Sequence, residues 1–196
     1  MANISSMTYG RVAEVLQQLG MVSQDRAHTV VEEWGADQYN LTPYDVACSL
    51  VGFGVAVRIH ADDIDFLEES YASLLNAAAA VAGGAVTVAN VRLHEGHATE
   101  GFGRPDFAPR DDVLEFERNG QLVSIPAEHF SEDYYDIAAA VDAVAALDPD
   151  DDPRAFHLVE FERERHRIYD TVMALVSPEQ ARALEENLGL QFPGVR

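Results

Sequence analysis

The sequence predicts an α+β fold, in which helices come first and an antiparallel β-sheet with helices packed on it follows. Three observations indicate this fold class. Apolar residues recur at helical spacing in the first part, they alternate with polar residues after Gly83-Gly84, and Asn119-Gly120 is a turn signal within the second part. We therefore expect one domain of residues 1–196, with a mainly helical part at 1–83 and a mixed part at 84–196.

Helix-start and helix-stop residues predict four helices in the first part. In chain order, the boundary residues are Gly20 after the first helix, Ser23 and Gly35 around the second, Thr42 and Gly52 or Gly54 around the third, and Asp62 and Gly83 around the fourth. The start of the third helix combines an N-cap hydroxyl, a proline at the first helical position and a carboxylate at the third. After that helix, the alternation of Val55, Val57 and Ile59 fits a short strand, with a continued helix as the alternative.

The second part begins with a predicted strand, a loop and a hairpin. Residues 85–93 have strand character, and residues 94–110 form a loop rich in glycine and proline. Asn119-Gly120 is typical of a two-residue hairpin turn. This turn fixes a register that pairs Phe116 with Val123 and Leu114 with Ile125 on an apolar face, and Glu115 with Ser124 on a polar face.

A helix is expected after the hairpin. Ser131 is its predicted N-cap, and the acidic turn DPDDDP at 148–153 ends it. At helical spacing, its buried stripe consists of Tyr134, Ile137, Val141 and Val144.

An antiparallel strand pair and a last helix complete the predicted fold. Residues 156–162 pair with residues 168–176, and the apolar run 172–176 predicts a central strand. The sequence Ser177-Pro178-Glu179-Gln180 predicts a capping box at the start of the last helix. The buried face of that helix consists of Ala181, Leu184 and Leu188.

The chain is strongly acidic, with 34 Asp and Glu against 13 basic residues, all of them arginine, and a net charge of −21. Nucleic acid and anionic membranes are polyanions, so this charge repels both at long range. The absence of lysine excludes a standard phosphate-binding P-loop, which requires one. High-GC codon usage is the favoured explanation for the missing lysine, and solubility is the alternative to partner recognition as the reason for the excess of acidic residues. We expect a basic protein as the partner.

Cysteine content and the first residues predict a cytoplasmic protein. Cys48 is the one cysteine of the chain, so an internal disulfide cannot form, and its apolar neighbours indicate a buried thiol. The first residues lack the basic and apolar regions of an export signal. The longest apolar run, at 77–82, is far too short to cross a membrane.

His94, Glu95 and His97 form the sharpest candidate for a metal site. Imidazole and carboxylate are usual zinc ligands, so a metal-dependent hydrolase is the alternative function for this chain. However, the two histidines are three residues apart in a glycine-containing loop, whereas the protease motif HExxH places them one helical turn apart. A third ligand would come from Glu100, Asp106 or His129. The favoured interpretation is a solvated loop, with no metal, cofactor or catalytic residue.

The hairpin and the segment after it concentrate acidic and aromatic residues. Acidic side chains beside aromatic ones suit a docking patch for a basic protein. The candidate partner-binding residues are Glu115, Glu117, Glu128, Glu132, Asp133, Tyr134, Tyr135 and Asp136. A solvated sheet face followed by a helix N-terminus is the alternative.

The second half also resembles a known group of proteins. The segment LEFERNGQLVSIPAEHFSEDYYDIAAAVDAV, the acidic break DDDPRAFHLVEF and the final VMALVSPEQARALEENLGLQF resemble small actinobacterial proteins of the polymorphic-toxin immunity type. The resemblance covers residues 86–192 and transfers no site residue. It implies a cytoplasmic α/β protein that binds a cognate toxin domain and blocks it.

Two classes of function therefore follow from the sequence. The first is an immunity-like inhibitor, not an enzyme, which occludes a toxin or another basic protein and needs no cofactor. Mimicry of nucleic acid is a variant of this class with a different target. The second class is the metal-dependent hydrolase built on His94, Glu95 and His97.

Overall fold

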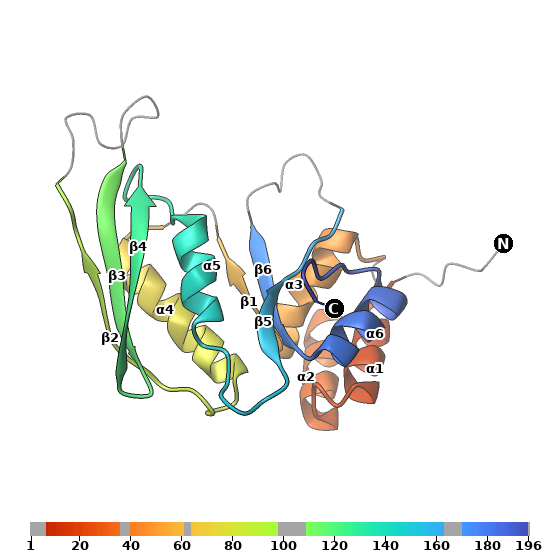
Figure 1. The fold of residues 1–196 in the computed structure, drawn as a ribbon. Helices are drawn as coiled ribbons and strands as arrows, with labels where there is room; N and C mark the ends of the chain where they lie inside the picture. The colour runs from red at the N-terminus through yellow and green to blue at the C-terminus, as the bar shows by residue number, and fades with distance from the viewer. Residues whose placement is uncertain (1–6, 36–39, 61–63, 98–108, 163–169, 196) are drawn as a thin grey trace.

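The computed structural model describes residues 7–35, 40–60, 64–97, 109–162 and 170–195 (Figure 1). The helices are α1 (Tyr9–Gln18), α2 (Gln24–Trp34), α3 (Pro43–Phe53), α4 (Leu67–Val81), α5 (Ile137–Ala145) and α6 (Pro178–Leu188). The strands are β1 (Ala56–Ile59), β2 (Val88–His94), β3 (Arg110–Arg118), β4 (Gln121–His129), β5 (Ala155–Leu158) and β6 (Thr171–Val176). The α+β fold class is confirmed. None of the described helices is both long and apolar enough to cross a membrane.

The strands form two antiparallel three-stranded sheets instead of one. The first has the order β1-β6-β5, and the second has the order β2-β3-β4. The apolar strand β6 is central in the first sheet, as predicted, and its pairing with β5 confirms the expected strand pair. Its other neighbour, β1, comes from the mainly helical part of the chain, so the first sheet joins the two parts predicted from the sequence.

The molecule is built in four layers, as Figure 1 shows. Helices α4 and α5 lie between the two sheets, and α1, α2, α3 and α6 lie beyond β1-β6-β5. One core joins the inner face of β2-β3-β4, the two middle helices and the side chains of Met173 and Leu175 on β6. The other core joins Val172 and Ala174 of β6 to the four outer helices. Alternate residues of β6 thus enter different cores, which explains its continuous apolar sequence.

Local signals position most of the elements. Ser23, Thr42 and Ser177 accept hydrogen bonds as N-caps, and the last two form complete capping boxes. The hairpin has the expected register, with Phe116 opposite Val123. Its turn residues Asn119 and Gly120 have φ of 51° and 77°, as a type I′ turn requires. These features confirm the predictions made from short-range patterns.

Two helix starts differ from the sequence predictions. Helix α4 begins at Leu67, after a non-helical stretch at 64–66, and not at Asp62, which lies outside the described residues. Helix α5 is capped by Asp136, not Ser131, because the Asp136 carboxylate accepts from the N–H groups of Ala138 and Ala139. Of the predicted stripe, Val144 is buried, Ile137 and Val141 are partly buried against the core, and Tyr134 precedes the helix and is exposed. The other buried residues of α5 are Ala139, Ala140 and Ala143.

Candidate functional site

The outer face of the sheet β2-β3-β4 is open to solvent at one end of the molecule (Figure 1). Residues of β3 alternate between buried and accessible, and the accessible ones lie opposite the accessible residues of β4. Four carboxylates lie on this outer face, from Asp111, Glu115, Glu117 and Glu128. These carboxylates outnumber the exposed Arg92 of β2, which lies opposite Glu115, so the face is acidic, and no helix of the described chain covers it.

The structure separates the predicted docking residues into three groups. Glu115, Glu117 and Glu128 lie on the outer face of the sheet. The second group consists of Glu132, Asp133 and Tyr134, which precede α5. The third group consists of Tyr135, which packs against the core, and Asp136, which is the N-cap of α5. Exposed apolar side chains border the face, because Leu122, Phe130 and Tyr134 are each more than half exposed.

Three of the predicted carboxylates hold other parts of the chain. Glu115 lies 2.8 Å from the His94 imidazole, and Glu132 accepts from Arg110 at 2.6 Å. Asp136 caps α5 and also accepts from the Glu128 N–H at 2.9 Å. Glu117, Glu128 and Asp133 remain as the carboxylates whose side chains make no hydrogen bond or ion pair within the described part of the chain.

His94, Glu95 and His97 are not arranged as one metal-ligand set. His94 faces Glu115, and Glu95 lies 3.4 Å from the Arg110 guanidinium. The glycine between Glu95 and His97 is structural, because a Cβ on Gly96 would lie 2.0 Å from the Asp111 carbonyl oxygen. Among the described residues, no three His, Cys, Asp or Glu side chains gather to hold a metal. Glu100 and Asp106 lie outside the described residues.

The inner face of the same sheet carries a buried polar network that the sequence analysis missed. The Asp112 carboxylate accepts from the Arg110 guanidinium at 2.7 Å, from the Gly96 N–H at 2.9 Å and from His129 Nδ1 at 2.7 Å. His129 Nε2 lies 3.0 Å from the Tyr71 hydroxyl on α4. The side chains of Asp112 and His129 are fully buried, so the network ties the sheet to α4 in the core.

The network holds Asp112 as an anion. Burial alone would raise the pKa of this carboxyl, but hydrogen bonds from Arg110, Gly96 and His129, together with the Arg110 charge, outweigh it and lower the pKa. On the other side of His129, burial raises the pKa of the Tyr71 hydroxyl, which stays neutral. Because Tyr71 and His129 are inaccessible to solvent, this arrangement supports the fold of the sheet and does not reach a substrate.

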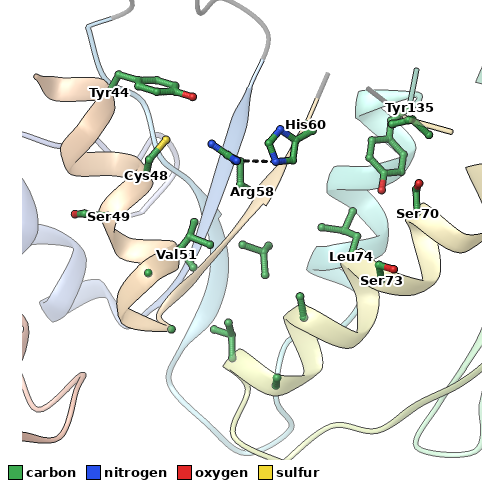
Figure 2. A pocket seen from close by; sticks show the side chains of 18 of the residues that line it. Tyr44, Cys48, Ser49, Val51, Arg58, His60, Ser70, Ser73, Leu74 and Tyr135 are labelled. Atoms are coloured by element: carbon green, nitrogen blue, oxygen red, sulfur yellow. Dashed lines mark hydrogen bonds between the residues drawn. The ribbon is translucent and has the colours of Figure 1, made fainter. Parts of the chain in front are cut away.

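A second candidate site is a cleft of about 1170 Å³ between α3 and α4 (Figure 2). Strand β1 forms its floor, and Tyr135 of the predicted docking set closes one end. Burial raises the pKa of Tyr135 to about 12, although a hydrogen bond with Ser70 lowers it in part. Trp34 and Phe66 are exposed aromatic residues that also line the cleft.

Polar side chains of α3 and of β1 and its end converge across the cleft from Tyr135 (Figure 2). Asp170 accepts from the Tyr44 hydroxyl at 2.5 Å and lies 3.5 Å from His60 Nδ1. The Arg58 Nε–H donates to His60 Nε2 at 3.0 Å (Figure 2). Cys48 lies beside this group, and burial raises the pKa of its thiol, an effect that hydrogen bonds with Tyr44 and Arg58 offset only in part. A raised pKa does not favour the thiolate that nucleophilic catalysis requires.

Comparisons with known proteins place no constraint on either site. Neither a protein-family model, nor a curated protein, nor a solved structure matches the chain. The chemistry of the two sites therefore has to be argued from their own residues.

Proposed function

We propose that the chain is a cytoplasmic binding protein that inhibits a basic protein partner, in the manner of an immunity protein blocking a toxin domain. The partner docks on the outer face of β2-β3-β4. The observation that carries this proposal is the open sheet face itself, which presents four carboxylates on alternate residues of β3 and β4. The resemblance of residues 86–192 to immunity-type proteins points to the same part of the chain.

The charge of the face suits a basic partner. A net charge of −21 attracts a cationic surface at long range, and the outer carboxylates orient it on approach. The strands provide a rigid platform for these carboxylates, because the Arg110–Asp112–His129 network fixes the opposite side of the same sheet. Electrostatic attraction mainly accelerates association, so most of the affinity has to come from other contacts.

Exposed apolar side chains supply those contacts. Leu122 is 68% exposed at the hairpin end, and Phe130 and Tyr134 are 52% and 53% exposed beyond the other end of β4. Large apolar groups that lose water at an interface provide most of the binding free energy, while a polar rim provides orientation. The inhibitor would therefore act by occlusion, with carboxylates over the basic cleft of the partner and these three residues as anchors.

The test uses the product of the gene adjacent to the one encoding this chain. We expect that protein to arrest growth when expressed alone and to be neutralised when the two are co-expressed. Purified together, the two proteins should form a complex whose association rate constant falls steeply with salt. If the neighbouring product is neither toxic nor bound, the proposal is wrong.

Charge-reversal variants locate the contact. Glu117→Arg, Glu128→Arg and Asp133→Arg alter carboxylates that make no hydrogen bond or ion pair in the described chain, so the fold should survive. Combined, they should lower the association rate constant about tenfold or more at low salt. The combined changes Glu33→Arg, Glu179→Arg and Glu186→Arg are the matched control, because they alter the net charge by the same amount on exposed residues of α2 and α6, at the other end of the molecule from the sheet (Figure 1). Equal loss in both variants would assign the effect to net charge and reject this docking face.

A further inference from the structure

The cleft between α3 and α4 has an apolar end. Both helices run toward this end, because Val51 lies in the last turn of α3 and Val81 is the last residue of α4 (Figure 2). Val57 and Leu74 are buried and line the cleft as well. A group that enters here loses water against side chains that form no hydrogen bonds. This end therefore suits an apolar part of a ligand.

The unmatched charge of the cleft is negative. Asp65 precedes α4 and Glu69 lies in its first turn, and both carboxylates line the cleft, are exposed, and make no hydrogen bond or ion pair within the described chain. Arg58 is the arginine of the lining, and its guanidinium already lies 3.9 Å from Asp170. The N-terminus of α4 adds only about half a positive charge, which two full negative charges outweigh.

Exposed aromatic rings accompany these carboxylates. Phe66 lies directly after Asp65 and is 67% exposed. Trp34 is 50% exposed, packs at 5.7 Å on the Tyr9 ring and lines the cleft with it. The face of an aromatic ring attracts organic cations, most strongly in the case of tryptophan. Carboxylates and rings together form surroundings that favour an ammonium group.

We propose that the cleft binds a small organic amine with an apolar body. Its ammonium group lies beside Asp65, Phe66 and Glu69, and its apolar body extends toward Val51 and Leu74. The volume of about 1170 Å³ is slightly above the range of roughly 300–1,000 Å³ typical of small-molecule pockets, so the whole ligand fits inside. The inference does not depend on the proposed function of the outer sheet face.

Other occupants fit the cleft less well. A polypeptide needs hydrogen bonds for its backbone, but Ala56, Val57 and Ile59 of β1 are each no more than 2% exposed, so this strand offers no accessible edge. A carboxylate ligand would compete with Asp170 for Arg58, and the net charge of −21 repels it. The same net charge attracts an amine.

Titration of decylamine into the full-length protein tests the proposal, at concentrations below those at which the amine forms micelles. Trp34 is the one tryptophan of the chain and lines the cleft, so its fluorescence reports binding there. We expect saturable binding, about tenfold tighter for decylamine than for decanol, which has the same chain and no charge. Absence of saturable binding, or equal affinities for the amine and the alcohol, would overturn the proposal.

Charge-neutralising variants locate the ammonium group. Asp65→Asn combined with Glu69→Gln should weaken the binding of decylamine about tenfold and leave the binding of decanol unchanged. Glu179→Gln combined with Glu186→Gln is the matched control, because it removes the same charge from exposed residues of α6. This control should bind decylamine like the wild type. Equal losses in the two double variants would assign the effect to net charge and reject the site.

A substitution that fills the cleft locates the apolar body. Ala77→Phe adds a ring from α4 to the space that the body needs, so it should weaken the binding of decylamine about tenfold. Asn76→Phe is the matched control, since it adds the same ring one residue earlier on α4, outside the lining of the cleft. Circular dichroism compares the folding of the two variants, and if Ala77→Phe does not fold, the charge variants decide the question. Equal binding by the two folded variants would place decylamine elsewhere and contradict the proposal.

Discussion

The two three-stranded sheets of this molecule expose different parts of themselves. Helices cover both faces of β1-β6-β5, and three of the four residues of its edge strand β1 are buried at the bottom of the cleft between α3 and α4. Helices α4 and α5 cover one face of β2-β3-β4, and its other face is open. The first sheet is therefore mainly part of the interior, whereas the second presents charged side chains to solvent.

The interiors of the two sheets also differ. The strand β6 is buried on both sides by apolar residues at 172–176. The strand β3 buries Leu114 and Phe116 beside two charged residues, Arg110 and Asp112. A buried ion pair requires its partners to remain together, because a single buried charge is strongly unfavourable. The second sheet should therefore be much more sensitive to loss of one polar group than the first.

The largest effect is expected from Asp112→Ala. This change leaves the Arg110 charge and the His129 ring without their buried acceptor, which should lower the free energy of unfolding by about 3–5 kcal/mol. Urea unfolding followed by circular dichroism measures it. The control is Asp111→Ala, because the neighbouring carboxylate lies on the exposed face of the same strand and should cost little. Similar losses in the two variants would contradict the assigned importance of the network.

The effect of Asp112→Ala should depend on pH. The folded protein lowers the pKa of Asp112 below its ordinary value of 3.8, so the carboxylate stabilises the fold fully above that value. This contribution is lost as the pH falls through the lower pKa of the folded state. The difference in unfolding free energy between wild type and Asp112→Ala should therefore shrink below about pH 3.8. Leu175→Ala, in the apolar interior of the first sheet, should show a nearly constant difference across the same range.

A smaller loss is expected from Tyr71→Phe. Removing the hydroxyl leaves His129 Nε2 without its 3.0 Å partner while the ring keeps its packing, so the cost should be about 1–2 kcal/mol. Thermal unfolding measures the change. Tyr134→Phe removes a hydroxyl from a side chain that is 53% exposed and should leave the melting temperature unchanged. A loss in Tyr71→Phe no larger than in this control would show that the hydroxyl does not stabilise the network.

The features predicted correctly from the sequence depend on residues close together in the chain. Asn119 and Gly120 determine the hairpin register, and Thr42 and Ser177 determine two helix starts, because each acts within a few residues. The predicted N-cap of α5 was wrong because Asp136, and not Ser131, accepts the hydrogen bonds at the start of that helix. Serine and aspartate are both common N-cap residues, so the sequence alone does not choose between them. The packing of the helix on the core makes the choice.

The buried network and the cleft depend on distant contacts. Tyr71 and His129 are 58 residues apart, and β1 becomes an edge strand through its pairing with β6, more than 100 residues later. One feature of the sequence nevertheless indicated the buried network. The hairpin register places Asp112 on the same face as Leu114, and it places His129 on the same face as Ile125. Extending the correct register toward the strand ends would have put charged residues in the core and indicated a polar network.

The smallest effect on stability is expected on the outer face of the second sheet. Glu117 is half-buried and makes no hydrogen bond or ion pair in the described chain, so Glu117→Gln should change the free energy of unfolding by no more than about 0.5 kcal/mol. Glu115→Gln should cost slightly more, because Glu115 lies 2.8 Å from His94. Chemical denaturation of the two variants at the same pH measures the difference. If the face serves binding, Glu117→Gln should weaken partner binding without lowering the stability of the protein. A large loss of stability in Glu117→Gln would mean instead that the carboxylate serves the fold. This variant therefore separates the two roles of the sheet within one strand, where Asp112 stabilises the inner side and Glu117 remains available on the outer side.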